Sequence, residues 1–174
     1  MVPLGPLNGK NFGTTISPWI ITPDALEPFK TSGPVQATDT PAHLEASDTP
    51  TYAIDLEVEI LSNGTSTVTC ESKLHTLYWT VPQMIAHLVT GGCGLRTGDI
   101  VATGTVSGFE KGTHGCLLET TEGGRTPLPL TDGTTRTYLQ DGDAVIMTAM
   151  AGGKSSGVGF GECAGKILAS KPAM

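Results

Sequence analysis

The chain has 174 residues, of which 38% are hydrophobic, and it carries a formal net charge of −7 with only 10 Lys and Arg residues. This length suits one domain, and no apolar run approaches the roughly 18 residues of a helical membrane span. The acidic balance, without a dense basic cluster, argues against nucleic acid or an anionic membrane as the main partner. No charged and apolar leader follows Met1, so the sequence predicts a soluble, cytoplasmic protein.

The first predicted element is a short helical turn. Thr22 and Pro23 open it, and it runs to Leu26 and ends at Pro28. Residues 31–51 are rich in Pro, Thr, Ser and Asp and have little periodicity. We interpret them as a long surface excursion rather than a domain linker, because strong strand signals follow at once.

Residues 52–60 form the clearest strand of the sequence. Alternate positions are apolar on one face (Ile54, Leu56, Val58, Ile60) and acidic on the other (Asp55, Glu57, Glu59). Asn63 and Gly64 then give the strongest short signal of a β-hairpin. Residues 66–71 are therefore predicted to form the returning strand.

One helix is well signalled, near residues 81–90. Thr80 is its expected N-cap, with Pro82 in the first turn and Gln83 at the capping-box position. Three residues supply an apolar stripe: Met84, Ile85 and Leu88. The Gly91-Gly92 pair stops the helix.

The pattern then returns to strands. Residues 99–102 and 143–147 are short, largely apolar runs behind Gly-Asp turns, as expected of buried strands. Residues 157–165 hold too many glycines for a helix and suit closely packed backbone. The 23 glycines of the chain favour many short strands joined by tight turns. The sequence thus predicts one mostly-β (α+β) domain with one clear helix.

Three segments could carry chemistry. Residues 9–15 place glycines around Lys10, Thr14 and Thr15, a composition that can hold an anion, although a surface turn is the favoured interpretation of this segment alone. Residues 95–108 run into Thr-Gly-Thr-Val-Ser-Gly, which places small hydroxyl donors at a strand end; a tight turn explains this block equally well. The third segment is Glu119, which follows two leucines and is either a paired base or a solvated carboxylate.

The histidines and cysteines carry less information. None of the histidines (His43, His75, His87, His114) has a partner at a useful spacing, so we interpret each as a surface or core residue. The four cysteines (Cys70, Cys93, Cys116, Cys163) lack zinc-ligand spacing and are expected to be reduced thiols.

Five blocks together resemble the fumarylacetoacetase family. They are Val-Pro-Leu-Gly-Pro-Leu-Asn-Gly-Lys-Asn-Phe-Gly-Thr-Thr-Ile-Ser-Pro-Trp at 2–19, Leu-Tyr-Trp-Thr at 77–80, the stretch 95–108, Leu-Gln-Asp-Gly-Asp at 139–143, and Gly-Phe-Gly-Glu-Cys-Ala-Gly-Lys at 159–166. They occur in the family's order and cover nearly the whole chain. The first and last blocks are specific to fumarylacetoacetases, whereas the Thr-Gly-Thr block is shared across the wider superfamily.

The resemblance implies that residues 1–174 are the C-terminal portion of a catalytic domain, an incomplete mixed β-roll that dimerises in the complete enzyme. It implies hydrolysis of a small diketo acid, fumarylacetoacetate, to fumarate and acetoacetate in tyrosine and phenylalanine degradation. It also implies a divalent cation, Mg²⁺ or Ca²⁺, that holds the substrate's diketone oxygens. A histidine oriented by a glutamate would activate the attacking water.

The resemblance also assigns roles to residues of this chain. Lys10 matches the family's active-site lysine, and we interpret it as lying beside the metal rather than binding it, because a protonated amine is no ligand. Thr14 matches a threonine of the metal site, and Thr105 matches a threonine that contacts substrate. Glu119 matches the glutamate that orients the catalytic histidine.

Other family residues are expected to fall outside this sequence. The four carboxylate metal ligands, the catalytic histidine, a substrate arginine and a glutamine all belong to family sequence before the point matched by Met1. The main hypothesis is therefore a hydrolase whose C-terminal catalytic region is this chain, and the alternative is an inactive module for folding or dimerisation. Binding of an unrelated small acid at the Lys10 loop is a third hypothesis.

Overall fold

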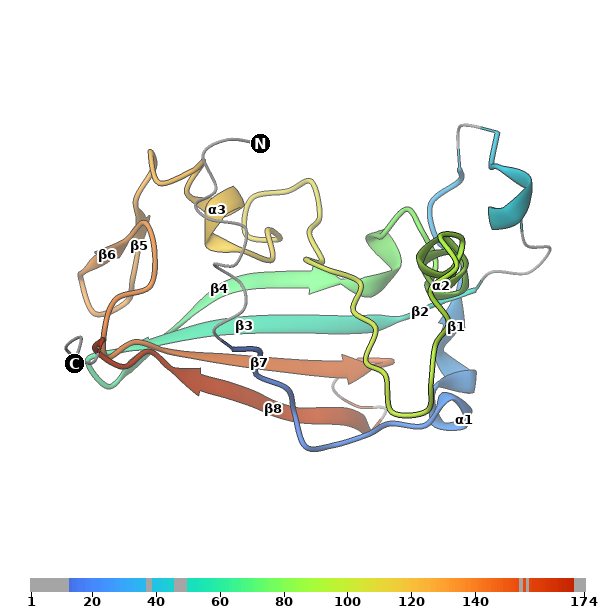
Figure 1. Ribbon diagram of the computed structural model, residues 1–174. Coiled ribbons are helices and arrows are strands. Elements are labelled where there is room, and N and C mark those ends of the chain that lie inside the picture. Colours follow the sequence, from blue (N-terminus) through green and yellow to red (C-terminus); the bar gives the residue numbers. More distant parts are fainter. Residues whose placement is uncertain (1–12, 37–38, 46–49, 154, 156, 171–174) are drawn as a thin grey trace.

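The computed structural model describes residues 13–36, 39–45, 50–153, 155 and 157–170, so Lys10 lies outside the described residues. Figure 1 shows a long twisted sheet with the short helices and loops gathered around it. The helical elements are α1 (Pro23–Leu26), η2 (Glu27–Phe29), η3 (Ala42–Leu44), η4 (Leu74–Thr76), α2 (Val81–Val89) and α3 (Leu117–Thr120). The strands are β1 (Lys30–Thr31), β2 (Thr51–Tyr52), β3 (Ile54–Ser62), β4 (Thr65–Lys73), β5 (Leu128–Pro129), β6 (Thr135–Arg136), β7 (Ala144–Ala151) and β8 (Val158–Lys166).

The main sheet has four strands in the order β4-β3-β7-β8, and every described pair in it is antiparallel. The predicted hairpin at Asn63 and Gly64 is confirmed: both residues have positive φ, 50° and 79°, as a tight two-residue turn requires. The strand predicted for 143–147 is also confirmed, and β7 extends it to Ala151. The sheet is open, so the roll is not closed by the described residues, and the parallel pairs expected of a mixed sheet do not occur among them.

The two faces of the sheet differ in character, as the alternation in β3 predicts. Cross-strand partners share a face, and one row on the first face runs Cys70, Val58, Met147, Cys163. The neighbouring row on the opposite face runs Glu71, Glu57, Thr148, Glu162. We call the first the apolar face and the second the acidic face. A bulge opposite Val58 and Glu59 inserts Thr69 as an extra residue of β4.

Helix α2 begins and ends where the sequence predicts. Its N-cap is Thr80, whose backbone N–H donates to Oε1 of Gln83 over 3.1 Å. Gln83 is buried and exchanges two amide hydrogen bonds with Gln36, at 2.9 and 3.1 Å. The apolar stripe, in contrast, is largely exposed, with Ile85 and Leu88 36% and 44% accessible. The amide pair ties the 31–51 excursion to α2, so this excursion is anchored at Gln36.

Residues 99–102 do not form the predicted buried strand. The segment has no ladder partner among the described residues, and Ile100 is 75% exposed. An apolar run becomes a strand only where another strand is available to satisfy its backbone groups. The prediction was wrong because an apolar run behind a Gly-Asp turn does not itself supply a partner strand.

Closely packed backbone is confirmed at the C-terminal strand. An added Cβ at Gly161, where φ is +71°, would lie 2.3 Å from Cδ1 of Trp19. The segment 15–19 therefore lies against the apolar face of β8, which it follows in Figure 1. Only glycine permits an indole to approach the strand backbone so closely.

The fold class is mostly β with a minor helical part, as predicted. Six hydrophobic residues are buried among those described: Leu44, Ile54, Ile60, Cys70, Leu130 and Ala151. This is a small core for the size of the chain. No helix in the described parts is both long and apolar enough to cross a membrane.

Candidate functional site

Glu119 lies in the first turn of α3, whose N-cap is Cys116. Its Oε2 accepts two hydrogen bonds, one from Ser107 Oγ over 2.8 Å and one from Cys116 Sγ over 3.1 Å. The side chain is otherwise exposed. Sequence analysis left open whether this carboxylate is paired or merely solvated, and the structure gives it two specific partners.

The loop that contains Thr105 packs directly on the segment that leads into α3. The Gly115 N–H donates to Ser107 Oγ over 3.0 Å, and an added Cβ at Gly115 would lie 2.5 Å from the carbonyl oxygen of Val106 and 2.9 Å from Cγ2 of Thr105. Because no side chain fits there, the two segments touch through backbone. Thr105 and Glu119, predicted separately, are thus brought to one place.

This loop pair is fastened to the main sheet. The Glu71 N–H of β4 donates to the carbonyl oxygen of Gly112 over 2.8 Å, and the Gly108 N–H donates to the carbonyl of Thr113 over 3.0 Å. Residues 105–119 therefore form a small layer beside β4. The position of Glu119 is set by the sheet as well as by its own short helix.

The two hydrogen bonds favour the ionised form of Glu119. Donation from Cys116 and then from Ser107 holds the pKa of Glu119 below its ordinary value, and the nearby His114 acts in the same direction. Burial and the Glu119 carboxylate raise the pKa of the Cys116 thiol. Cys116 is therefore a protonated donor at neutral pH and a poor nucleophile.

A cavity of about 470 Å³ lies between this layer and the apolar face. It is lined by Val58, Ile60, Thr69, Cys70, His114, Gly115, Cys116, Leu117, Thr120, Tyr138, Leu139, Val145 and Met147. Its lining is mostly apolar, with His114 and the two thiols among the polar groups. Burial raises the pKa of Cys70 also, so both thiols of the cavity remain protonated.

Thr14 precedes the segment that packs on β8, the edge strand opposite β4 in the same sheet. It is exposed, and its neighbour Thr15 accepts a weak hydrogen bond from Cys163 Sγ over 3.6 Å and contacts Gly165. Cys163 belongs to the row that crosses the apolar face, so the Thr14 segment and the Glu119 layer border one face from its two edges. The structure gives no direct contact between Thr14 and Glu119.

A divalent cation does not fit the described residues by themselves. No three His, Cys, Asp or Glu side chains among them lie close enough to hold a metal ion. Thr14 offers a single neutral oxygen, whereas Mg²⁺ and Ca²⁺ prefer several carboxylate oxygens.

The remaining histidines take different positions. His43 and His87 line a second cavity of about 690 Å³ between α2, η3 and residues 101–103. The Nδ1 atom of His75 is buried without a hydrogen-bond partner among the described groups. Among the four histidines only His114 acts on the charge of Glu119, and sequence spacing gave no indication of this.

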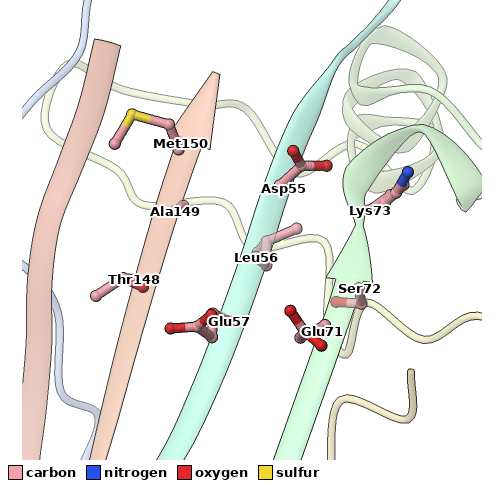
Figure 2. A pocket seen from close by; sticks show the side chains of 9 residues that line it. All are labelled: Asp55, Leu56, Glu57, Glu71, Ser72, Lys73, Thr148, Ala149 and Met150. Carbon is pink, nitrogen blue, oxygen red and sulfur yellow. The ribbon is translucent and has the colours of Figure 1, made fainter. Parts of the chain in front are cut away.

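The acidic face carries a shallow hollow of about 300 Å³. Figure 2 shows Glu57 and Glu71 on neighbouring strands there, with Asp55 and Lys73 one row away. Directly opposed glutamates repel each other, and none of the residues assigned by the family resemblance lies in this hollow.

Sequence analysis missed the roles of Ser107 and Cys116. Ser107 belongs to the quoted Thr-Gly-Thr-Val-Ser-Gly block but was given no partner, and Cys116 was expected only to be a reduced thiol. The spacing of Cys116 and Glu119, N-cap to third helical residue, matches the two positions of a capping box and could have indicated their contact. The 12-residue separation of Ser107 and Glu119 gave no such signal.

Comparisons with known proteins agree with the resemblance. The family described as "Fumarylacetoacetate (FAA) hydrolase C-terminal" matches residues 1–168. The fumarylacetoacetase of Arabidopsis thaliana is 49% identical over 173 residues, 98% of this chain and 41% of the relative. The proteins of that name from Emericella nidulans and Homo sapiens are 48% and 43% identical, over 96% of this chain and 39% and 40% of their own lengths. The chain thus spans about two fifths of the relatives it matches.

Proposed function

We propose, from the premise that this chain belongs to the fumarylacetoacetate hydrolase family, that it is the C-terminal catalytic region of a fumarylacetoacetase. The reaction is hydrolysis of the carbon–carbon bond of fumarylacetoacetate, which yields fumarate and acetoacetate in tyrosine and phenylalanine degradation. The observation that supports this proposal best is the fixed, ionised Glu119 beside the Thr105 loop.

In this proposal the chain supplies part of the site and the rest of the family fold supplies the base. Glu119 accepts a hydrogen bond from the catalytic imidazole, holds one tautomer, and stabilises the cation formed when the ring takes a proton from water. The water oxygen bonds to the substrate carbonyl carbon. The carbon–carbon bond then breaks with its electron pair on the acetoacetate fragment, which the imidazolium protonates.

Two other residues have proposed roles toward the substrate. The Thr105 hydroxyl, exposed at the loop, donates to a substrate oxygen. Lys10 stabilises the negative charge that develops on the attacked carbonyl. A divalent cation, Mg²⁺ or Ca²⁺, would act as a Lewis acid in the complete enzyme. Because the described residues form no metal site, we assign its carboxylate ligands to the remainder of the family fold, with Thr14 at the periphery.

The second candidate is an inactive module that retains only the fold and a dimer surface. Two observations favour it for the chain by itself: the described residues bring no metal-ligand trio together, and large apolar side chains such as Ile100 and Phe109 are 75% and 98% exposed. Such surface requires a covering partner. In the complete enzyme the covering partners are the N-terminal part of the family fold and the second subunit of a homodimer. We place this enzyme in the cytoplasm.

The test is turnover of fumarylacetoacetate by three preparations. The first is the chain alone, the second is the chain fused to the unmatched N-terminal part of the Arabidopsis relative, and the third is that N-terminal part alone. We expect fumarate and acetoacetate from the fusion only. A folded fusion that binds the substrate but releases neither product would refute the catalytic proposal and support the inactive module.

A further inference from the structure

We propose that Ser107 and Cys116 are positioning residues that fix the Glu119 carboxylate by its Oε2 atom and so aim Oε1 at the catalytic imidazole. This inference rests on the proposed role of Glu119 and adds two residues that the family resemblance does not assign. The contacts that carry it are the hydrogen bonds of 2.8 Å from Ser107 Oγ and 3.1 Å from Cys116 Sγ.

The two donors occupy the same oxygen. No described group donates to Oε1 of Glu119, so one oxygen of the carboxylate is held by the protein and the other is open. A carboxylate on an exposed helical turn would otherwise sample several rotamers. Fixing it at one atom leaves the second atom in a defined place, as an orienting acid requires.

Ser107 is itself fixed. Its oxygen accepts the Gly115 N–H over 3.0 Å while its hydroxyl hydrogen is given to Glu119. The N–H thereby directs the hydroxyl hydrogen away from the Gly115 side and toward the carboxylate. Because Gly115 touches the backbone at Val106, the Ser107 hydroxyl joins the Thr105 loop to Glu119.

Cys116 supplies the second donor to Oε2 of Glu119. Its thiol is the N-cap side chain of α3 and reaches the third residue of the same helix. Because burial and Glu119 raise the pKa of the thiol, it remains a donor to the ionised Glu119 at neutral pH. Serine at position 116 would keep a donor, whereas alanine would remove it.

The first arm of the test measures the carboxylate directly in the 174-residue chain. The side-chain carboxyl resonance of Glu119, labelled with ¹³C and assigned by its loss in Glu119→Gln, is titrated in wild type and variants. His114, Cys116 and Cys70 are the other titratable groups that act on this site, and their substitutions are avoided in this arm. We expect a higher pKa for Glu119 in Ser107→Ala, recovery in Ser107→Thr, and no change in the matched loop control Thr103→Ala, whose hydroxyl donates to the carbonyl oxygen of Gly104 and to no other described group.

The second arm measures turnover in the fused protein described above. Ser107→Ala should lower kcat about tenfold with KM within about twofold, because the loss falls on general-base assistance rather than on substrate binding. The kcat of Ser107→Thr and of Cys116→Ser should stay within about threefold of wild type. The kcat of Cys116→Ala should be lower than that of either variant. If Ser107 had only a structural role, Ser107→Ala would instead lower the melting temperature, without a selective fall in kcat at constant KM.

The two arms separate the possible failures. An unmoved Glu119 pKa in Ser107→Ala overturns the inference whatever the activity. A raised pKa with unchanged kcat, in a fusion that Glu119→Gln inactivates, overturns the positioning role while the proposed function stands. If Glu119→Gln is itself fully active, the proposed role of Glu119 fails, and the inference fails with it.

Discussion

The buried pair of Arg136 and Asp143 is the ion pair with most effect on the described fold. Two parallel hydrogen bonds join the side chains, Nε to Oδ2 at 2.7 Å and Nη2 to Oδ1 at 2.8 Å. Nη2 also donates to Ser62 Oγ over 2.7 Å, and the Gln140 N–H donates to Oδ2 over 2.9 Å. The side chains are only 7% and 3% exposed. The pair thus ties β6 and the turn before β7 to the end of β3.

Replacing Asp143 by Ala removes the acceptor of three hydrogen bonds and leaves a guanidinium without its counter-charge. Breaking a buried pair from one side costs about 3–5 kcal/mol, and we expect about 3 kcal/mol. We choose the lower end of this range because the flanking Thr135 and Gln140 are exposed. Water can therefore reach Arg136 once the Asp143 carboxylate is removed. The matched control is Glu27→Ala, which breaks the exposed Glu27–Lys30 pair at 2.7 Å and should cost about 0.3 kcal/mol.

The assay is urea unfolding followed by circular dichroism, at one protein concentration for all variants, with the midpoint compared at unchanged slope. The pH dependence provides a second check. Arg136 holds the pKa of Asp143 below its ordinary value, so the stabilisation is fully present above the unfolded pKa of about 4 and is lost as the pH falls through the folded pKa. The stability gap between wild type and Asp143→Asn should therefore narrow below about pH 4. Two results would refute the reasoning. One is a loss of unfolding free energy under about 1 kcal/mol in Asp143→Ala, and the other is a stability difference between wild type and Asp143→Asn that stays constant in acid.

Three further predictions concern the site and the surface. In the fused protein, Glu119→Gln should lower kcat about 10²–10⁴-fold with an unchanged melting temperature; a fall of less than about threefold would show that Glu119 is not the orienting acid. The chain alone should bind Mg²⁺ or Ca²⁺ only weakly, because Thr14 is its one family ligand, and a micromolar dissociation constant by titration calorimetry would contradict this. The chain alone should also self-associate and bind a hydrophobic dye, since Ile100 and Phe109 are exposed; a compact, dye-free monomer in sedimentation would speak against it.

The sequence determined those features that depend on near neighbours along the chain. Asn63 and Gly64 tolerate positive φ, which fixes the hairpin turn and, with the alternation in β3, its register. Thr80 and Gln83 satisfy each other across one helical turn, which fixes the start of α2. The family resemblance assigned roles to Thr105 and Glu119 without any knowledge of their distance. Lys10 remains a prediction, because it lies outside the described residues.

The tertiary structure decided which of those groups meet and which surfaces are covered. Residues 99–102 and 143–147 look alike as apolar runs, but only the second has strands on both sides, and hydrogen bonding to neighbours is what makes a strand. Asp143 is two residues from a charged neighbour, Asp141, that stays exposed; only the hairpin of β5 and β6 buries Asp143 by bringing Arg136 onto it. In the same way Ser107 reaches Glu119 because Gly115 lets two backbones touch. Contacts of this kind depend on segments folded against each other, and local sequence preferences carry no information about them.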